Sequence, residues 1–109
     1  MKKINITDLR QAEDRLVDFI ATQEGSPIID VTNALIELRD LDGNSVLRLT
    51  LGSGITFADS TFTIQLTDSN TAELVGKYNY EVWYLDSLNA DVLVAFGSMK
   101  FSPTFGRFD

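Results

Sequence analysis

The sequence contains no cysteine and no histidine. The absence of cysteine excludes a disulfide framework and thiolate ligands for zinc. Without histidine, Ser-His-Asp catalysis, Cys-His catalysis and histidine-ligated metals are excluded as well. No stretch approaches the roughly 20 apolar residues of a membrane-spanning helix, and no apolar segment of the kind found in signal peptides follows Lys2 and Lys3. We therefore expect a chain that uses no cofactor, metal or membrane and is made in the cytoplasm.

Positive charge is also scarce, because nine Lys and Arg residues stand against sixteen Asp and Glu residues. The cations are scattered and form no basic stripe, which argues against nucleic-acid binding. Carboxylate chemistry would need two acids facing each other across a cleft. Most acids instead stand in predicted turns, where they accept backbone hydrogen bonds: Asp40, Asp42, Asp59, Asp68, Asp86 and Asp91. The sequence therefore predicts a protein that is not an enzyme.

Short stretches with period-two alternation of apolar and polar residues fill most of the chain. The clearest is 61–66, where Phe62, Ile64 and Leu66 alternate with polar residues. Strands are predicted over 15–22, 34–39, 46–51, 55–57, 61–66, 74–84 and 92–101, the last two forming a hairpin. Residues 8–14 are open between a turn and a helical turn. Residues 68–74 are a candidate one-turn helix, since Asn70 precedes Glu73 with capping spacing.

Strands separated by turns, with no long helix, favour an all-β, Ig-like antiparallel β-sandwich of about seven strands. Residues 1–109 are expected to form a single domain, with 1–14 and 102–109 as arms. Leu74, Gly76 and Tyr78 have the spacing of a tyrosine corner, in which a tyrosine hydroxyl bonds to the backbone just upstream. The alternative is that Tyr78 is one more half-buried strand aromatic.

Five aromatic residues are candidates for interaction. Phe105 and Phe108 follow the last predicted strand, where they form either a docking arm or a segment folded over one end of the sandwich. Trp83, Tyr84 or Phe96 could serve as a stacking platform for a sugar, Trp83 on condition that it lies on the outward face.

The order of these pieces resembles a β-sandwich module of tailed-bacteriophage structural proteins, similar to the N-terminal domain of baseplate upper proteins. The matching pieces are Gly25–Thr32, Ala34–Gly43, Val46–Thr50 with Gly54–Thr56, Phe62–Thr67, Thr71–Leu74, Gly76–Val82 and Gly97–Phe101. The chain departs from that pattern at Gln11–Asp14, where a glycine-acid signal is expected, and it has no long C-terminal extension.

The resemblance implies a non-enzymatic virion component of tail, baseplate, neck or capsid, in several copies that contact other virion proteins. The alternative is a β-sandwich module that binds a carbohydrate or a cell surface.

Overall fold

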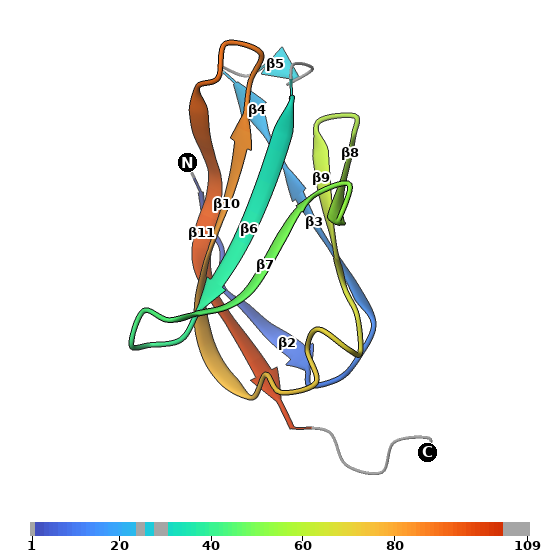
Figure 1. Cartoon of the computed structure of the whole chain (residues 1–109), viewed down its shortest axis with the longest axis vertical. Helices are drawn as coiled ribbons and strands as arrows, with labels where there is room; N and C mark the ends of the chain where they lie inside the picture. Colours follow the sequence, from blue (N-terminus) through green and yellow to red (C-terminus); the bar gives the residue numbers. More distant parts are fainter. Residues whose placement is uncertain (1, 24–25, 28–30, 104–109) are drawn as a thin grey trace.

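The computed structural model describes residues 2–23, 26–27 and 31–103 (Figure 1). Within these ranges every regular element is a strand and no helix occurs, so no helix there could cross a membrane. The strands are β1 (Lys2–Lys3), β2 (Ile6–Arg10), β3 (Arg15–Ile20), β4 (Thr22–Gln23), β5 (Ser26–Pro27), β6 (Asn33–Arg39), β7 (Ser45–Leu51), β8 (Gly54–Ala58), β9 (Thr61–Leu66), β10 (Gly76–Leu85) and β11 (Asp91–Ser102).

Nearly all strands belong to one sheet in the order β1-β11-β10-β6-β7-β8-β9-β3, in which β2 also pairs with β11. The sheet bends over on itself between β7 and β8, where only a short parallel pairing joins Thr50 to Gly54 and Leu51 to Ile55. The β3 end thus lies over β10, and the rings of Phe19 and Tyr80 meet with centroids 5.6 Å apart. The predicted Ig-like β-sandwich is confirmed.

The core lies between the two layers and takes every second side chain from the strands that face it. Phe62, Ile64 and Leu66 of β9 are fully buried, as their alternation predicts. The other buried apolar residues are Leu9, Phe19, Ala21, Ala34, Ile36, Leu38, Ile55, Leu74, Tyr80, Val82, Tyr84, Ala95, Met99 and Phe101.

Two of the six acids expected to stabilise turns, Asp40 and Asp86, accept backbone hydrogen bonds in their turns, whereas Asp91 begins strand β11. Asp40 Oδ1 accepts hydrogen bonds from the backbone N–H groups of Asp42 and Asn44 in the β6–β7 turn. Asp86 Oδ1 accepts them from Leu88 and Ala90 in the β10–β11 turn. The backbone and side-chain donors of Asn44, followed by the N–H of Asp42, hold the pKa of Asp40 below its ordinary value.

The N-terminal segment, expected to be an arm up to residue 14, lies along β11 as β1 and β2. Leu9 enters the core and is fully buried. The alternation is hard to read there because the register of β2 against β11 shifts between Met99 and Phe101. Residues 68–74 form hydrogen-bonded turns rather than a helix, with Thr71 N donating to Thr67 O and Leu74 N to Thr71 O.

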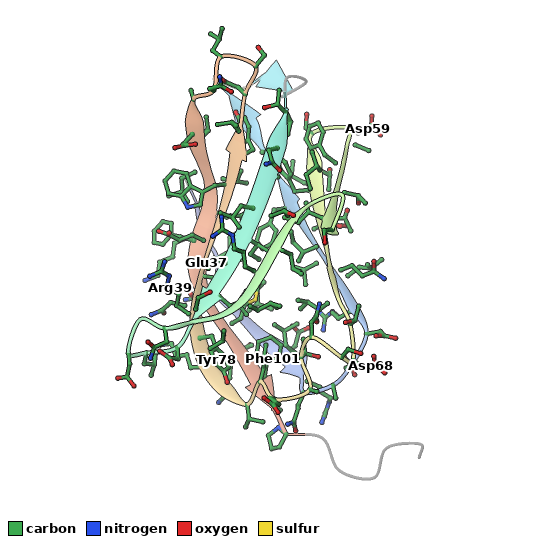
Figure 2. All side chains as sticks on the ribbon, viewed as in Figure 1. Glu37, Arg39, Asp59, Asp68, Tyr78 and Phe101 are labelled. Atoms are coloured by element: carbon green, nitrogen blue, oxygen red, sulfur yellow. The ribbon has the colours of Figure 1, made fainter. Side chains whose placement is uncertain are left out.

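The chain enters β10 through a corner built on Tyr78. Its hydroxyl donates to Val75 O and accepts from Val75 N, both at 3.1 Å. Gly76 takes a positive φ of 97°, and the Tyr78 ring stands edge-on to Phe101 with centroids 5.9 Å apart (Figure 2). These contacts have the form of a tyrosine corner.

We expect Tyr78→Phe to lower the free energy of unfolding by about 1 kcal/mol, because it removes these hydrogen bonds and keeps the ring. Urea denaturation measures the loss. Thr56→Val is the matched control: it also removes a hydroxyl, but from the exposed Thr56 of β8, and it should stay within about 0.5 kcal/mol. Equal losses in the two variants would contradict a stabilising role for this corner.

Candidate functional site

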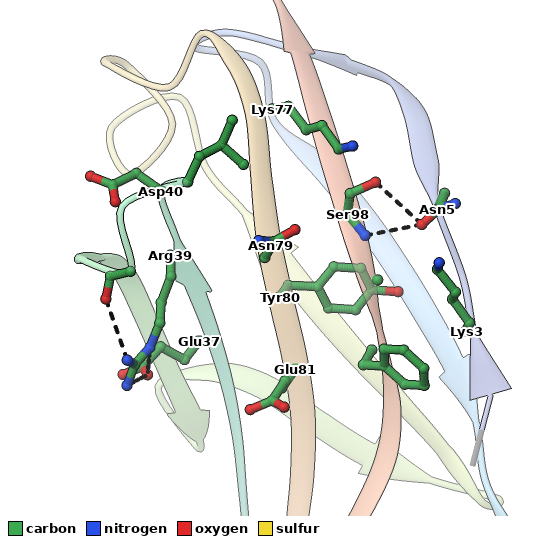
Figure 3. Close-up of a pocket in the computed structure, with 14 residues that line it drawn as sticks. Lys3, Asn5, Glu37, Arg39, Asp40, Lys77, Asn79, Tyr80, Glu81 and Ser98 are labelled. Carbon is green, nitrogen blue, oxygen red and sulfur yellow. Dashed lines mark hydrogen bonds and ion pairs between the residues drawn. The ribbon is translucent and has the colours of Figure 1, made fainter.

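An open groove of about 690 Å³ crosses the outer face of the layer that contains β1, β11, β10 and β6 (Figure 3). The turn after β6 closes one of its sides. Its lining is mostly polar: Lys3, Asn5, Glu37, Arg39, Asp40, Leu41, Gly43, Lys77, Asn79, Tyr80, Glu81, Phe96, Gly97 and Ser98.

The strand registers place the groove side chains in rows across the sheet. Glu81 of β10 lies opposite Phe96 of β11 on one side and Glu37 of β6 on the other. Asn79 is flanked in the same way by Ser98 and Arg39. Directly opposed residues in antiparallel strands have Cβ atoms roughly 4.5–5.5 Å apart, so the strands themselves hold each row together.

The β6 side of the groove carries carboxylates, one of which is paired with arginine. Arg39 Nε donates to Glu37 Oε1 at 2.7 Å, Ser45 Oγ donates to Glu37 Oε2 at 3.3 Å, and Arg48 lies 3.9 Å from Oε2. The Arg39 hydrogen bond, opposed by partial desolvation, keeps the pKa of Glu37 below its ordinary value. Glu81 beside it accepts a hydrogen bond from Trp83 Nε1 at 3.3 Å. Glu37 is therefore a persistent acceptor and a poor proton donor.

The β11 side of the groove is basic. Lys3 and Lys77 flank Asn5 and Ser98, and their ammonium groups lie on that side of β10 (Figure 3). Neither lysine takes part in an ion pair within the described part of the chain. Asn5 Oδ1 accepts hydrogen bonds from Ser98 N and Ser98 Oγ, at 3.1 and 3.2 Å. These contacts fix the amide while the two cations face solvent.

The aromatic candidates are placed in different surroundings. Phe96 is half-buried in the groove, whereas Trp83 lines a smaller neighbouring hollow of about 170 Å³. Tyr84, the third candidate for a sugar platform, is buried and stacks on Phe62 with ring centroids 5.7 Å apart, because it shares the inner face of β10 with Tyr80. That part of the platform prediction is wrong. Phe105 and Phe108 lie outside the described residues.

Most of the groove was not predicted. The polar residues at alternate positions of 34–39 and 76–84 predicted a solvent-exposed face of the sheet. They gave no sign that this face carries a binding site. The contribution of Lys3 and Asn5 depends on β1 lying along β11, for which the sequence gives no signal. No cluster of three or more carboxylates suited to a metal ion occurs among the described residues.

No protein-family model and no curated protein sequence matches the chain. Among solved structures, the chain is similar to CopC from Methylosinus trichosporium OB3b, with 14% sequence identity and a TM-score of 0.53. The likeness covers 95% of this chain and 89% of that one. The predicted kinship with bacteriophage baseplate proteins, and with it the virion function, is wrong, because the likeness found is to CopC, which is not a phage protein. The pieces that suggested it are turns and strands common to many β-sandwiches. At this level of identity, the likeness establishes the β-sandwich fold of the chain.

Proposed function

We propose that this chain is a non-catalytic binding module that holds an acidic sugar in the groove across β11, β10 and β6. The observation that carries the proposal is the division of the groove into two halves. Lys3 and Lys77 stand on one side without ion-pair partners in the described chain, and Glu37 and Glu81 stand on the other.

The two halves suit the two kinds of polar group on an acidic sugar. A sugar carboxylate accepts hydrogen bonds and carries negative charge, so it belongs beside the lysines. Sugar hydroxyls donate, so they belong beside Glu37, Glu81 and the amide of Asn79. The half-buried Phe96 ring offers an apolar surface to one face of a pyranose.

Size and charge support the same ligand class. Pockets for small molecules occupy about 300–1,000 Å³, and the groove lies within that range. The cations Lys3, Arg39 and Lys77 are balanced in its lining by Glu37, Asp40 and Glu81. A ligand that carries one carboxylate and many hydroxyls fits this balance better than a polyanion does.

The same geometry supports binding without hydrolysis. A glycosidase needs one carboxylic acid that is protonated when the substrate is bound. Glu37 is held by Arg39 at 2.7 Å with a lowered pKa, which favours the opposite state. Glu37 is therefore suited to accept hydrogen bonds from sugar hydroxyls and not to act as a general acid.

Titration of the purified chain with an oligosaccharide that carries a single glucuronic acid residue among neutral sugars tests the proposal. We expect Lys77→Ala to weaken binding by about tenfold or more, since a hydrogen bond to a charged group contributes roughly 1.5–3 kcal/mol. Arg10→Ala is the matched control, because Arg10 is an exposed cation of β2 that does not line the groove. Calorimetry gives the dissociation constants.

The carboxyl-reduced form of the same oligosaccharide isolates the charge. It should bind more weakly to the unmodified chain and should respond little to Lys77→Ala. Equal affinity for both forms, or an Arg10→Ala loss as large as that of Lys77→Ala, would contradict the proposal.

A further inference from the structure

Strand β3 presents an open edge on the other layer of the sandwich. It pairs with β9 and ends the sheet, and none of the described residues pairs with its other side. Ala21 N donates to Ser60 O across the same ladder, so alternate residues counted back from Ala21 direct their main-chain groups toward β9. Leu16, Asp18 and Ile20 therefore direct their N–H and C=O groups toward the open side.

The side chains of these three residues also face away from the core. Leu16 is 64% exposed and Ile20 is 75% exposed, although apolar residues of their size are usually buried. Asp18 stands between them, and its Oδ1 accepts a hydrogen bond from Thr63 Oγ1 at 2.7 Å. The edge thus combines unpaired backbone groups with an apolar, acidic, apolar row of side chains.

A hollow of about 540 Å³ adjoins one end of this row. Leu16 lines it together with Asp14 and Asp68, among other residues, and Figure 2 shows Asp68 at that side of the molecule. Its single cation, Arg15, is bonded to Asp8 at 2.9 Å. The surroundings of the row are therefore acidic as well.

A second copy of the chain fits this edge poorly. The antiparallel register that brings Leu16 of one copy against Ile20 of the other also sets Asp18 against Asp18. If the register is shifted by two residues, Asp18 of one copy instead lies opposite Leu16 or Ile20 of the other. Like charges directly opposed across strands are destabilising, and an acid in the middle of an edge strand discourages such pairing.

We propose that β3 binds an extended segment of another protein by antiparallel strand addition, and that this segment carries a lysine or arginine between two apolar residues at alternate positions. The basic residue pairs with Asp18 while the apolar residues cover Leu16 and Ile20. Main-chain hydrogen bonds supply affinity, and the charged pair selects the partner. This surface is separate from the groove and does not depend on the function proposed for it.

Two synthetic peptides test the surface, each with threonine at every other position. The first carries valine, lysine and valine at the intervening positions, and the second carries glutamate in place of the lysine. Fluorescence anisotropy with the full chain should show the lysine peptide binding about fivefold tighter at low salt. N-methylation at both valines should abolish binding, because it removes donors that strand addition requires.

Charge reversal at Asp18 supplies the decisive comparison. Asp18→Lys should reverse the preference so that the glutamate peptide binds more tightly. Asp42→Lys changes the net charge equally at an exposed turn residue away from β3, and it should leave the preference as it is. Equal binding of the two peptides, binding that survives N-methylation, or an equal response to both substitutions would overturn the proposal.

Discussion

Replacing Phe62 with alanine is expected to lower the free energy of unfolding by about 3–5 kcal/mol. Phe62, the second residue of β9, is fully buried, and its ring centroid lies 4.7 Å from that of Phe57 and 5.7 Å from that of Tyr84. Tyr84 belongs to the opposite layer, so the substitution opens a cavity where the two layers meet. Domains of this size have total free energies of unfolding of about 5–15 kcal/mol, so this substitution would remove a large part of the stability.

Urea denaturation followed by tyrosine and tryptophan fluorescence measures this effect. Leu88→Ala is the control, because Leu88 is 86% exposed in the β10–β11 turn and its truncation should change stability by no more than about 0.5 kcal/mol. Should Phe62→Ala cost less than about 1 kcal/mol, the packing of β9 against β10 described above would be incorrect.

Gly97→Ala is the second change with a large expected effect, roughly 2–4 kcal/mol of lost stability. A Cβ at this position would lie 2.0 Å from the carbonyl oxygen of Ile4, a backbone atom that cannot move alone. The same oxygen accepts the Tyr80 hydroxyl at 2.8 Å, and Ile4 N donates to Phe96 O at 2.8 Å. Accommodating the methyl group must therefore displace the N-terminal segment from β11.

Gly43→Ala separates this clash from the general cost of a positive φ. Gly43 has a φ of +89°, but nothing lies within 4 Å of the position that its Cβ would take. Its loss should stay near the roughly 1–2 kcal/mol that a left-handed conformation costs a non-glycine residue. Hydrogen exchange should accelerate at the Ile4 amide in Gly97→Ala only. A similar loss in both variants, with Ile4 still protected, would contradict the close approach.

Each of the seven strands predicted from the sequence has a counterpart in the structure, in β3 and in β6 to β11. Bulky apolar residues at alternate positions made these segments recognisable as strands. For example, the fully buried Ile36 and Leu38 alternate with the more exposed Glu37 and Arg39. A one-residue slip would send such side chains into water, so alternation of this strength specifies both the strand and its inner face.

The short pieces could not be predicted in the same way. Strand β1 has two residues, which is too few for periodicity to separate a strand from a turn. In β2 the apolar residues Ile6 and Leu9 are three positions apart, so they do not show the alternation of a strand. Their position is decided by distant contacts, such as the Tyr80 hydroxyl on Ile4 O. The groove shares this limit, since Lys3 and Asn5 reach it only through β1 and the residues that follow it.

The functional prediction went wrong for a related reason. Turns such as Asp40–Asn44 and strands such as 61–66 recur wherever sheets pack face to face, so their order carried information about the fold and little about kinship. The groove side chains say more about chemistry. Among them, Lys77 and Glu81 occupy outward positions on the same strand and differ in charge, a detail that a pattern of apolar residues does not record.

The parallel alignment of β1 and β2 with β11 has a mechanical consequence. If opposite forces are applied at the N-terminal end of β1 and at the C-terminal end of β11, the parallel strands slide lengthwise past one another. The load then falls on many interstrand bonds simultaneously, in shear, instead of peeling them apart one by one. The sandwich therefore resists stretching most strongly where β1 and β2 pair with β11.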